Sequence, residues 1–165
     1  MIILELITPQ NALLFKDIRL RALQDTPTAF SATYAAESQL SDADWAKRAA
    51  QWSGDKSVGY LAMDAGVACG IASGLLDSGD ATRADLFSMW VAPTHRRLGI
   101  GRKLVDAIID WTRAQSARAL LLLVTSNNQG AVKFYQQLGF TLTGRTEPYR
   151  NDPSLLNYEM RRFIS

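Results

Sequence analysis

Apolar and polar residues recur along the first third of the chain mostly at helical spacing. Residues 2–7 form a short apolar run that predicts a strand, and residues 29–38 predict a helical piece. Ser41 is followed three residues later by Asp44, the pattern of a capping box, which predicts that a helix begins there. An earlier helix is indicated by apolar residues that recur at helical spacing: Leu13, Leu14, Ile18, Leu20 and Leu23.

The period changes at Ser57. Two apolar runs, 57–64 and 67–77, flank Ala65-Gly66 and predict two strands joined by a tight turn. Further strands are predicted at 83–91, 118–124, 140–147 and 155–163, and helices at 100–114 and 131–138.

Strand, glycine turn, helix and strand follow one another over residues 83–124, which is the order of a βαβ unit. Its two strands are expected to be parallel and joined by a right-handed crossover. The sequence therefore predicts a mixed α/β fold, with one layer of sheet covered by helices.

The composition fits one globular domain over residues 1–165. The chain is 47% hydrophobic and 21% charged, and its net charge of +2 is too small to indicate a nucleic-acid partner. One cysteine and one histidine exclude an internal disulfide, a cysteine-based zinc site and a multi-histidine metal site. No apolar stretch approaches the ~18 residues that would predict a membrane span. We therefore expect a soluble, cytoplasmic protein that binds no metal and no membrane.

The stretch THRRLGIGRKL, residues 94–104, predicts a site for an anion. It lies between a strand and a helix, where free N–H groups and the helix dipole attract negative charge. Gly99 and Gly101 would let phosphate oxygens approach the backbone. The stretch is not a P-loop, because Lys103 follows Gly101 by two residues and precedes Leu104 rather than Ser or Thr. It also departs from the Rossmann fingerprint, because Leu104 takes the third glycine position. Alternatively, the glycines only form a tight turn.

Two motifs in register resemble the GNAT superfamily of N-acetyltransferases. Residues 96–101 match [QR]-x-x-G-x-[GA], and NQGAVKFYQQLGF, residues 128–140, resembles the second signature of that superfamily. The resemblance covers roughly residues 83–145. It implies a mostly antiparallel sheet with a splayed parallel pair, 83–91 and 118–124, and acetyl-CoA as co-substrate between those strands.

The resemblance also implies the cofactor-binding residues. Backbone groups of one strand would pair with the pantetheine arm, the glycine turn would hold the pyrophosphate, and the second motif would flank the cofactor. The residues are, in that order, Met89, Trp90 and Val91; Arg96, Arg97, Leu98, Gly99, Ile100, Gly101 and Arg102; and Asn128, Ala131 and Phe134. Asn128 is also suited to be a helix N-cap, and both roles are compatible.

The implied reaction is direct attack of an amine on the thioester in a ternary complex. Tyr135 occupies the position of the acid that protonates the departing thiolate. Glu37 ranks first as general base, with Asp85, Glu147 and a chain of water molecules as alternatives. Carboxylates at such positions are more often solvated surface groups, and Asp85, at the start of its strand, is expected to lie too far from the thioester.

The acceptor amine, on a small molecule or a peptide, is not specified by these motifs. We expect residues 25–45 and 145–155 to build its pocket. The alternative to an enzyme is a non-catalytic module that binds and senses acyl-CoA. A homodimer is compatible with the resemblance, although no interface is visible in the sequence.

Overall fold

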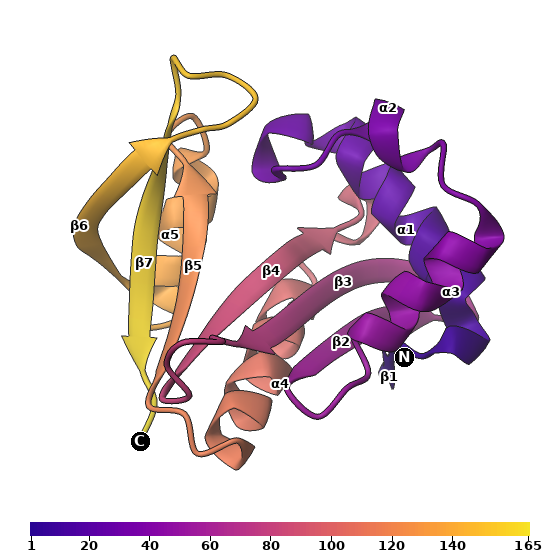
Figure 1. The fold of residues 1–165 in the computed structure, drawn as a ribbon, viewed down its shortest axis with the longest axis horizontal. Helices are drawn as coiled ribbons and strands as arrows, with labels where there is room; N and C mark the ends of the chain where they lie inside the picture. Colours follow the sequence, from indigo (N-terminus) through magenta and orange to yellow (C-terminus); the bar gives the residue numbers. More distant parts are fainter.

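A computed structural model describes residues 1–165 and contains a seven-stranded sheet with helices on both faces (Figure 1). Three short 3₁₀ turns lie at Pro9–Asn11, Pro27–Ala29 and Pro93–His95. In chain order, the elements are β1 (Ile2–Leu6), α1 (Ala12–Asp25), α2 (Tyr34–Glu37), α3 (Asp42–Gln51), β2 (Ser57–Asp64), β3 (Val67–Leu76), β4 (Arg83–Val91), α4 (Ile100–Ala114), β5 (Ala119–Thr125), α5 (Gln129–Gln137), β6 (Thr141–Pro148) and β7 (Leu156–Phe163).

The strand order is β1-β2-β3-β4-β5-β7-β6. All neighbours are antiparallel except β4 and β5, which are parallel and joined by α4. This confirms the predicted fold class, a mixed and mostly antiparallel sheet with one parallel pair. None of the helices combines the length and the hydropathy that a membrane crossing requires.

The helical piece predicted over 29–38 is wrong for most of its length. Only Tyr34–Glu37 is helical, and Thr33 caps it by accepting a hydrogen bond from the Ala36 amide. The preceding residues are held by a tertiary contact instead, because the Tyr149 hydroxyl donates to the carbonyl oxygens of Pro27 and Phe30. By contrast, the capping box that opens α3 is present as predicted.

The core has two parts, one on each face of the sheet. Helices α4 and α5 cover one face, where Leu104 and Ile108 are fully buried. Helices α1 and α3 cover the other face, where the Trp45 ring packs edge-on against Phe15 with centroids 5.4 Å apart. On this second face the helices lie over β2 and β3 and leave β5 and β7 open (Figure 1), so that Leu123 is half exposed.

The parallel pair separates soon after it forms. Strands β4 and β5 are paired only at Arg83/Ala119, Ala84/Leu120 and Asp85/Leu121. Beyond this point β4 carries a bulge against β3, and Ser88 adopts a left-handed backbone with φ of 59°. A bulge bends its strand and increases the local twist. The two strands therefore diverge into a V that opens in the middle of the sheet, as expected for the splayed pair.

Helix α4 packs closely on β3 because two glycines remove side chains from its path. A Cβ atom at Gly74 would lie 3.0 Å from the Trp111 ring and 3.2 Å from Ile108. At Gly70 the nearest atom would be a methyl carbon of Leu104, at 3.0 Å. This packing places the N-terminus of α4 at the opening between β4 and β5.

Replacement of Ile108 by Ala should lower the free energy of unfolding by about 2–5 kcal/mol, because the site is fully buried and cannot collapse around the lost carbons. Urea denaturation followed by circular dichroism measures this change. Leu13→Ala is the matched control, since Leu13 is 62% exposed and its truncation should cost less than about 0.5 kcal/mol. Equal losses in the two variants would contradict the assignment of this core.

Candidate active site

The glycine loop, residues 96–101, presents a row of free backbone amides at the N-terminus of α4. The first amide of this region that donates to a carbonyl is that of Lys103, which binds Gly99. Gly99 has φ of 78°, and no atom lies within 4 Å of the position where a Cβ would stand. Free amides, open space and the positive end of a 15-residue helix form a site suited to a diphosphate.

Gly101 joins the loop to two other residues predicted for the cofactor. A Cβ atom at Gly101 would lie 3.0 Å from the methyl carbon of Met89 and 3.1 Å from the Phe134 ring. The structure therefore brings the loop, β4 and α5 into contact at this glycine. Ile100 is buried in the core, so it can offer only its backbone to a ligand.

Arg96 is engaged by the protein itself. Its Nη2 donates to Asp25 Oδ2 at 2.6 Å, and its Nε donates to the Val91 carbonyl at 3.0 Å. The Trp90 indole donates to the same Asp25 oxygen at 3.0 Å. Burial alone would raise the pKa of Asp25, but the hydrogen bonds from Trp90, Thr26 and Arg96 outweigh it and hold the pKa below its usual value. Arg96 therefore ties the loop to α1, and the Trp90 side chain lies in the core.

The other cations of the loop face solvent. Arg97, Arg102 and Lys103 are exposed, and the only ion pair among them joins Arg102 to Asp106 at 3.8 Å. Exposed guanidinium and ammonium groups beside free amides can add charge-assisted hydrogen bonds to a bound phosphate.

A small cavity of about 80 Å³ lies where β4 and β5 diverge, next to α5. Met89, Asn128, Ala131 and Tyr135 are in its wall. The Asn128 side chain accepts a hydrogen bond from the Ala131 amide at 3.1 Å, so Asn128 is the N-cap of α5. This confirms its structural role.

Tyr135 is buried between two aromatic rings. The ring centroids of Phe134 and Phe140 lie 5.1 Å and 5.6 Å from its own, both in edge-on arrangements. Burial raises the pKa of the Tyr135 hydroxyl, and no hydrogen bond or neighbouring charge opposes this rise. The group therefore stays protonated over the physiological pH range, which is the state required of a proton donor, while the raised pKa makes it a weaker acid than a free phenol.

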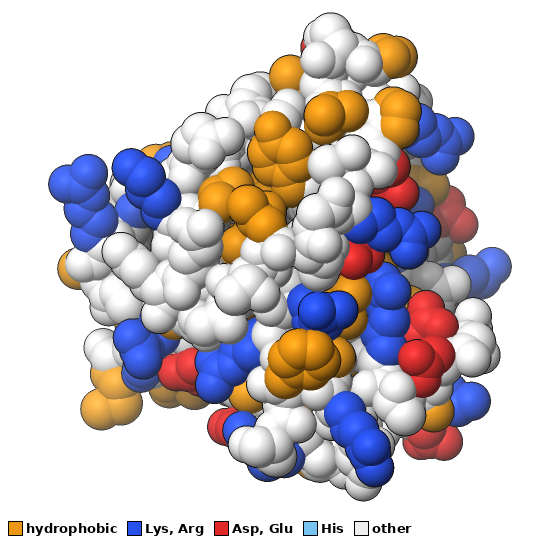
Figure 2. Space-filling model, turned by 90° about the vertical axis from the view of Figure 1, so that its left-hand side faces the viewer, with side chains coloured by type: hydrophobic (Ala, Val, Ile, Leu, Met, Phe, Trp, Pro, Cys, Tyr) orange, Lys and Arg blue, Asp and Glu red, His pale blue; other side chains and the backbone are white.

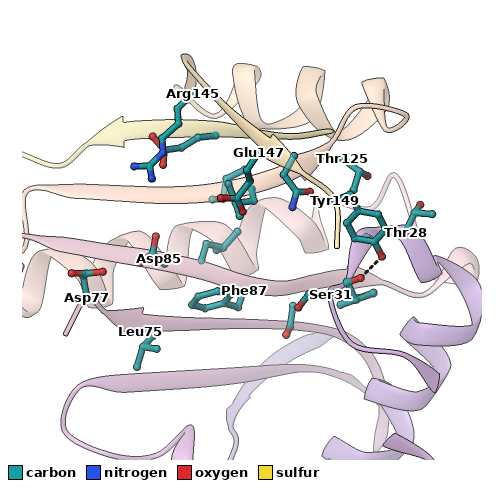
Figure 3. A pocket seen from close by; sticks show the side chains of 18 of the residues that line it. Thr28, Ser31, Leu75, Asp77, Asp85, Phe87, Thr125, Arg145, Glu147 and Tyr149 are labelled. Carbon is teal, nitrogen blue, oxygen red and sulfur yellow. Dashed lines mark hydrogen bonds between the residues drawn. The ribbon is translucent and has the colours of Figure 1, made fainter. Parts of the chain in front are cut away.

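A larger cavity of about 600 Å³ lies beside the same strands (Figure 3), and Arg19, Phe30 and Trp52 are in its wall. The predicted acceptor segments contribute Thr28–Ser31 and part of 145–149 to its wall, and β4, β5 and β7 supply most of the rest. The two cavities share one wall at the divergence of the parallel strands. The shared residues are Ala29, Leu86, Phe87, Ser88, Leu122, Leu123 and Thr125.

Glu37 is buried and held by two arginines. Arg19 Nε lies 3.0 Å from its Oε1, and Arg48 Nη1 lies 3.0 Å from its Oε2. Burial alone would raise the pKa of Glu37, but the hydrogen bonds and charges of Arg19 and Arg48 outweigh it and lower the pKa. Glu37 does not reach the wall of either cavity, whereas Arg19 does. This environment disfavours the predicted role as general base, because a base needs a pKa near the operating pH and access to the substrate.

The two alternative carboxylates do line the larger cavity. Asp85 pairs with Arg83 at 2.9 Å, yet burial raises the pKa of Asp85 above its usual value. Glu147 is exposed on β6. Both are labelled in Figure 3, where Asp85 lies at the same end of the cavity as Asp77 and Arg145, and Glu147 lies nearer the middle. Tyr149 lies within the predicted acceptor segment 145–155, although sequence reasoning gave it no individual role. Arg19 and Ser88 were not singled out, because nothing in their local patterns distinguishes them from surface residues.

Charge on the molecular surface is dispersed. On the face drawn in Figure 2, Lys and Arg side chains are interspersed with acidic and apolar groups rather than gathered into one stripe. No group of three or more His, Cys, Asp and Glu residues is placed to hold a metal ion.

Comparison with known proteins places the chain in a family. The sequence model of the acetyltransferase (GNAT) family matches residues 20–140. An L-methionine sulfoximine/L-methionine sulfone acetyltransferase of Salmonella typhimurium is 30% identical over 82 residues, which are 46% of this chain and 48% of that protein. An L-amino acid N-acyltransferase of Escherichia coli is 32% identical over the same shares of the two chains. The chain thus spans about half the length of the curated relatives it matches.

Solved structures share the fold at lower identity. An acetyltransferase of the GNAT family from Streptococcus pneumoniae superimposes with a TM-score of 0.86 at 23% identity, over 100% of both chains. An acetyltransferase of Salmonella typhimurium, solved with its cofactor acetyl-CoA, superimposes with a TM-score of 0.82 at 19% identity, over 100% of this chain and 95% of the other. Since the family model covers most of the chain and the predicted motifs lie within the match, this protein belongs to the GNAT family of acetyltransferases.

Proposed function

We propose that this protein transfers an acetyl group from acetyl-CoA to a primary amine by direct attack in a ternary complex. The observation that carries the proposal is the wall shared by the two cavities, because two substrates, one in each cavity, would meet there. The alternative, a module that binds acyl-CoA without catalysis, would have no need of the larger cavity.

The residues around the small cavity fit acetyl-CoA. The free amides of Arg97–Arg102 suit its diphosphate. Strand β4 beyond Asp85 has no partner strand on the β5 side, so the backbone at Met89–Val91 can meet the pantetheine amides, except for the Val91 carbonyl, which accepts from Arg96. Asn128, Ala131 and Phe134 flank this path on α5. Bound acetyl-CoA supplies the thioester that the amine attacks.

We propose that Tyr135 donates the proton to the departing thiolate. Its hydroxyl is protonated at neutral pH and lies beside the small cavity. The proton of the amine leaves through the larger cavity, where Asp85 and Glu147 offer carboxylates and water has access. Glu37 is not part of this route. We propose that it orients Arg19 instead.

The acceptor does not follow from the relatives. Their names specify an amino acid analogue, the alanine of ribosomal protein bS18, and streptothricin. The acceptor amine of this protein can therefore belong to a small molecule or to a peptide. Its location in the cytoplasm, a homodimeric state and the absence of nucleic-acid partners stay predictions.

Tyr135→Phe should lower kcat on the order of 10²-fold or more, because the thiolate loses its acid, while the Kd for acetyl-CoA changes little. Thiol release measures kcat, and calorimetry measures the Kd. Tyr34→Phe is the control, since it removes a phenol hydroxyl from an exposed position outside both cavities. Unchanged turnover in Tyr135→Phe would exclude the acid role.

Gly99→Ala should weaken coenzyme A binding roughly tenfold, the loss expected for one charge-assisted amide hydrogen bond of ~1.5 kcal/mol. Gly66→Ala is a matched control, because Gly66 also has a positive φ and open space around it but lies in the β2–β3 turn. Both variants should lose about 1–2 kcal/mol of stability through backbone strain. Equal coenzyme A affinity in the two variants would refute the diphosphate site.

Glu37→Gln should lower the free energy of unfolding at pH 7 by about 2 kcal/mol, because both arginines lose a charged partner. The carboxylate has a lowered pKa in the folded state, so its contribution is present above the unfolded value of about 4.3 and is lost as the pH falls through the folded value. The stability difference from the wild type should therefore shrink below about pH 4. We expect the acid limb of the pH–rate profile to keep its position, and a lost limb would restore Glu37 as the base.

A further inference from the structure

Arg19 places a guanidinium at the junction of the two cavities. Its Nη1 donates to Ser88 Oγ at 2.8 Å, and Ser88 belongs to the wall that the cavities share. Its side chain lines the larger cavity and is only 13% exposed, so solvent screens its charge little. An amine bound at the shared wall beside Ser88 therefore lies close to this cation.

The cluster around Arg19 has one positive charge in excess. Arg19 and Arg48 share the single carboxylate of Glu37. Arg48 lies over the Trp45 ring at 5.5 Å and does not line the cavity, so the side of the cluster that faces the substrate is Arg19. Arg19 is paired with Glu37, yet this carboxylate carries one charge less than the two guanidiniums that share it. A mostly buried guanidinium beside a substrate cavity therefore favours an anionic group on the substrate.

Arg19 also has donors to spare and a fixed orientation. A guanidinium carries five N–H groups. Nε and Nη2 bind Glu37 and Nη1 binds Ser88, which leaves two N–H groups without a protein partner. The Phe30 ring lies 4.9 Å from its central carbon and limits its rotation. Two free N–H groups on a fixed plane suit the two oxygens of a carboxylate.

The opposite end of the cavity is unsuited to an anion. Three carboxylates outnumber two arginines there: Asp77, Asp85 and Glu159 against Arg83 and Arg145. Figure 3 shows Asp77, Asp85 and Arg145 at one end, away from Thr28 and Tyr149 at the other. Arg145 is exposed, so water competes for its charge.

A second polar group on the shared wall lacks a partner. Thr125 is 4% exposed, and its Oγ1 forms no hydrogen bond within the protein, although the residue lines both cavities. A buried hydroxyl without a partner is destabilising unless a ligand satisfies it. An amine N–H is a suitable donor to this oxygen.

From this arrangement we propose that the acceptor is a free α-amino acid, with its carboxylate on Arg19 and its amine at the shared wall beside Thr125. The inference rests on the proposed acetyl transfer. One carbon separates the two groups of an α-amino acid, so binding the carboxylate at Arg19 keeps the amine near Ser88. The amine nitrogen forms the amide bond as the thioester C–S bond breaks. The amine loses one proton, and the departing thiolate of coenzyme A takes up a proton. The products are an N-acetyl amino acid and free coenzyme A.

The test compares acceptors that differ only at the carboxylate, with the full chain and acetyl-CoA. For leucine, lysine, methionine and phenylalanine, thiol release is measured with the free amino acid, its α-amide, its decarboxylated amine and a tripeptide with the same first residue. At least one free amino acid should exceed its amide and tripeptide in kcat/KM by about tenfold or more. Conversion to the amide lowers the pKa of the amine and supplies more of the neutral nucleophile, so intrinsic reactivity opposes this preference.

Arg19→Gln separates recognition from a structural role. The ratio of kcat/KM for the acid to that for the amide should fall towards one, mainly through a higher KM for the acid. Arg48→Gln removes the other arginine on Glu37 and should keep the ratio. If Arg19 had only a structural role, Arg19→Gln would lower kcat/KM for the acid and for the amide by the same factor. The ratio would then stay unchanged, and the proposal would be overturned. If Arg19→Gln does not fold, Arg19→Lys, which keeps the charge but loses the planar fork, replaces it.

The outcomes for the wild type distinguish the two levels of inference. Amides, decarboxylated amines or tripeptides that react as well as the free amino acids would overturn the amino acid proposal and leave acetyl transfer intact. If no acceptor gives thiol release although calorimetry shows that acetyl-CoA binds, the proposed function itself is overturned. The amino acid proposal is then overturned with it.

Discussion

The divergence of β4 and β5 is the constraint on which the rest of the site depends. The two strands pair over three positions and then part, with the β4 bulge at Ser88 on the side of β3. Backbone groups left unpaired inside a sheet require partners, and a strand edge accepts an extended ligand most easily. Helices α4 and α5 begin beside the same opening, so free amides of the glycine loop and the N-cap of α5 face one region. Opening the sheet thus creates both cavities and the wall between them.

Neighbouring residues of the glycine loop have different tasks. Gly99 provides a left-handed backbone over open space, whereas Gly101 allows close packing against Met89 and Phe134. Arg96 holds the loop to α1 through Asp25, and Arg97 remains exposed. A single motif therefore combines residues that shape the loop with residues that are free to meet a phosphate. The motif pattern alone does not separate the two groups, because the separation depends on contacts with α1, β4 and α5.

The acceptor side shows how a charged group acquires its role from its neighbours. Glu37 lies in the region expected to border the acceptor, yet two guanidiniums lower its pKa and keep it out of the cavity. Its effect on chemistry would pass through Arg19, which it holds in place. Tyr149 has a comparable effect on the opposite wall, because its hydroxyl fastens the segment at Pro27 and Phe30 across the cavity. Both walls of the acceptor cavity are thus maintained by long-range contacts.

The sequence alone determined the order of strands and helices, the capping box at Ser41, the glycine loop and the second motif that contains Tyr135. The elements and the cap depend on local periodicity and turn residues, which a short window of sequence contains. The second motif and the role of Tyr135 came from the resemblance to the GNAT superfamily. The tertiary structure decided which residues surround the acceptor. Arg19 and Ser88 are separated by 69 positions yet share a hydrogen bond. Ser88 adopts a left-handed backbone that is usually marked by a glycine in the sequence, so its conformation could not be recognised from the residue type. Burial, pKa and pairing arise only when distant segments pack together, so the neighbours of Glu37 and the place of Arg19 could not be predicted from local patterns.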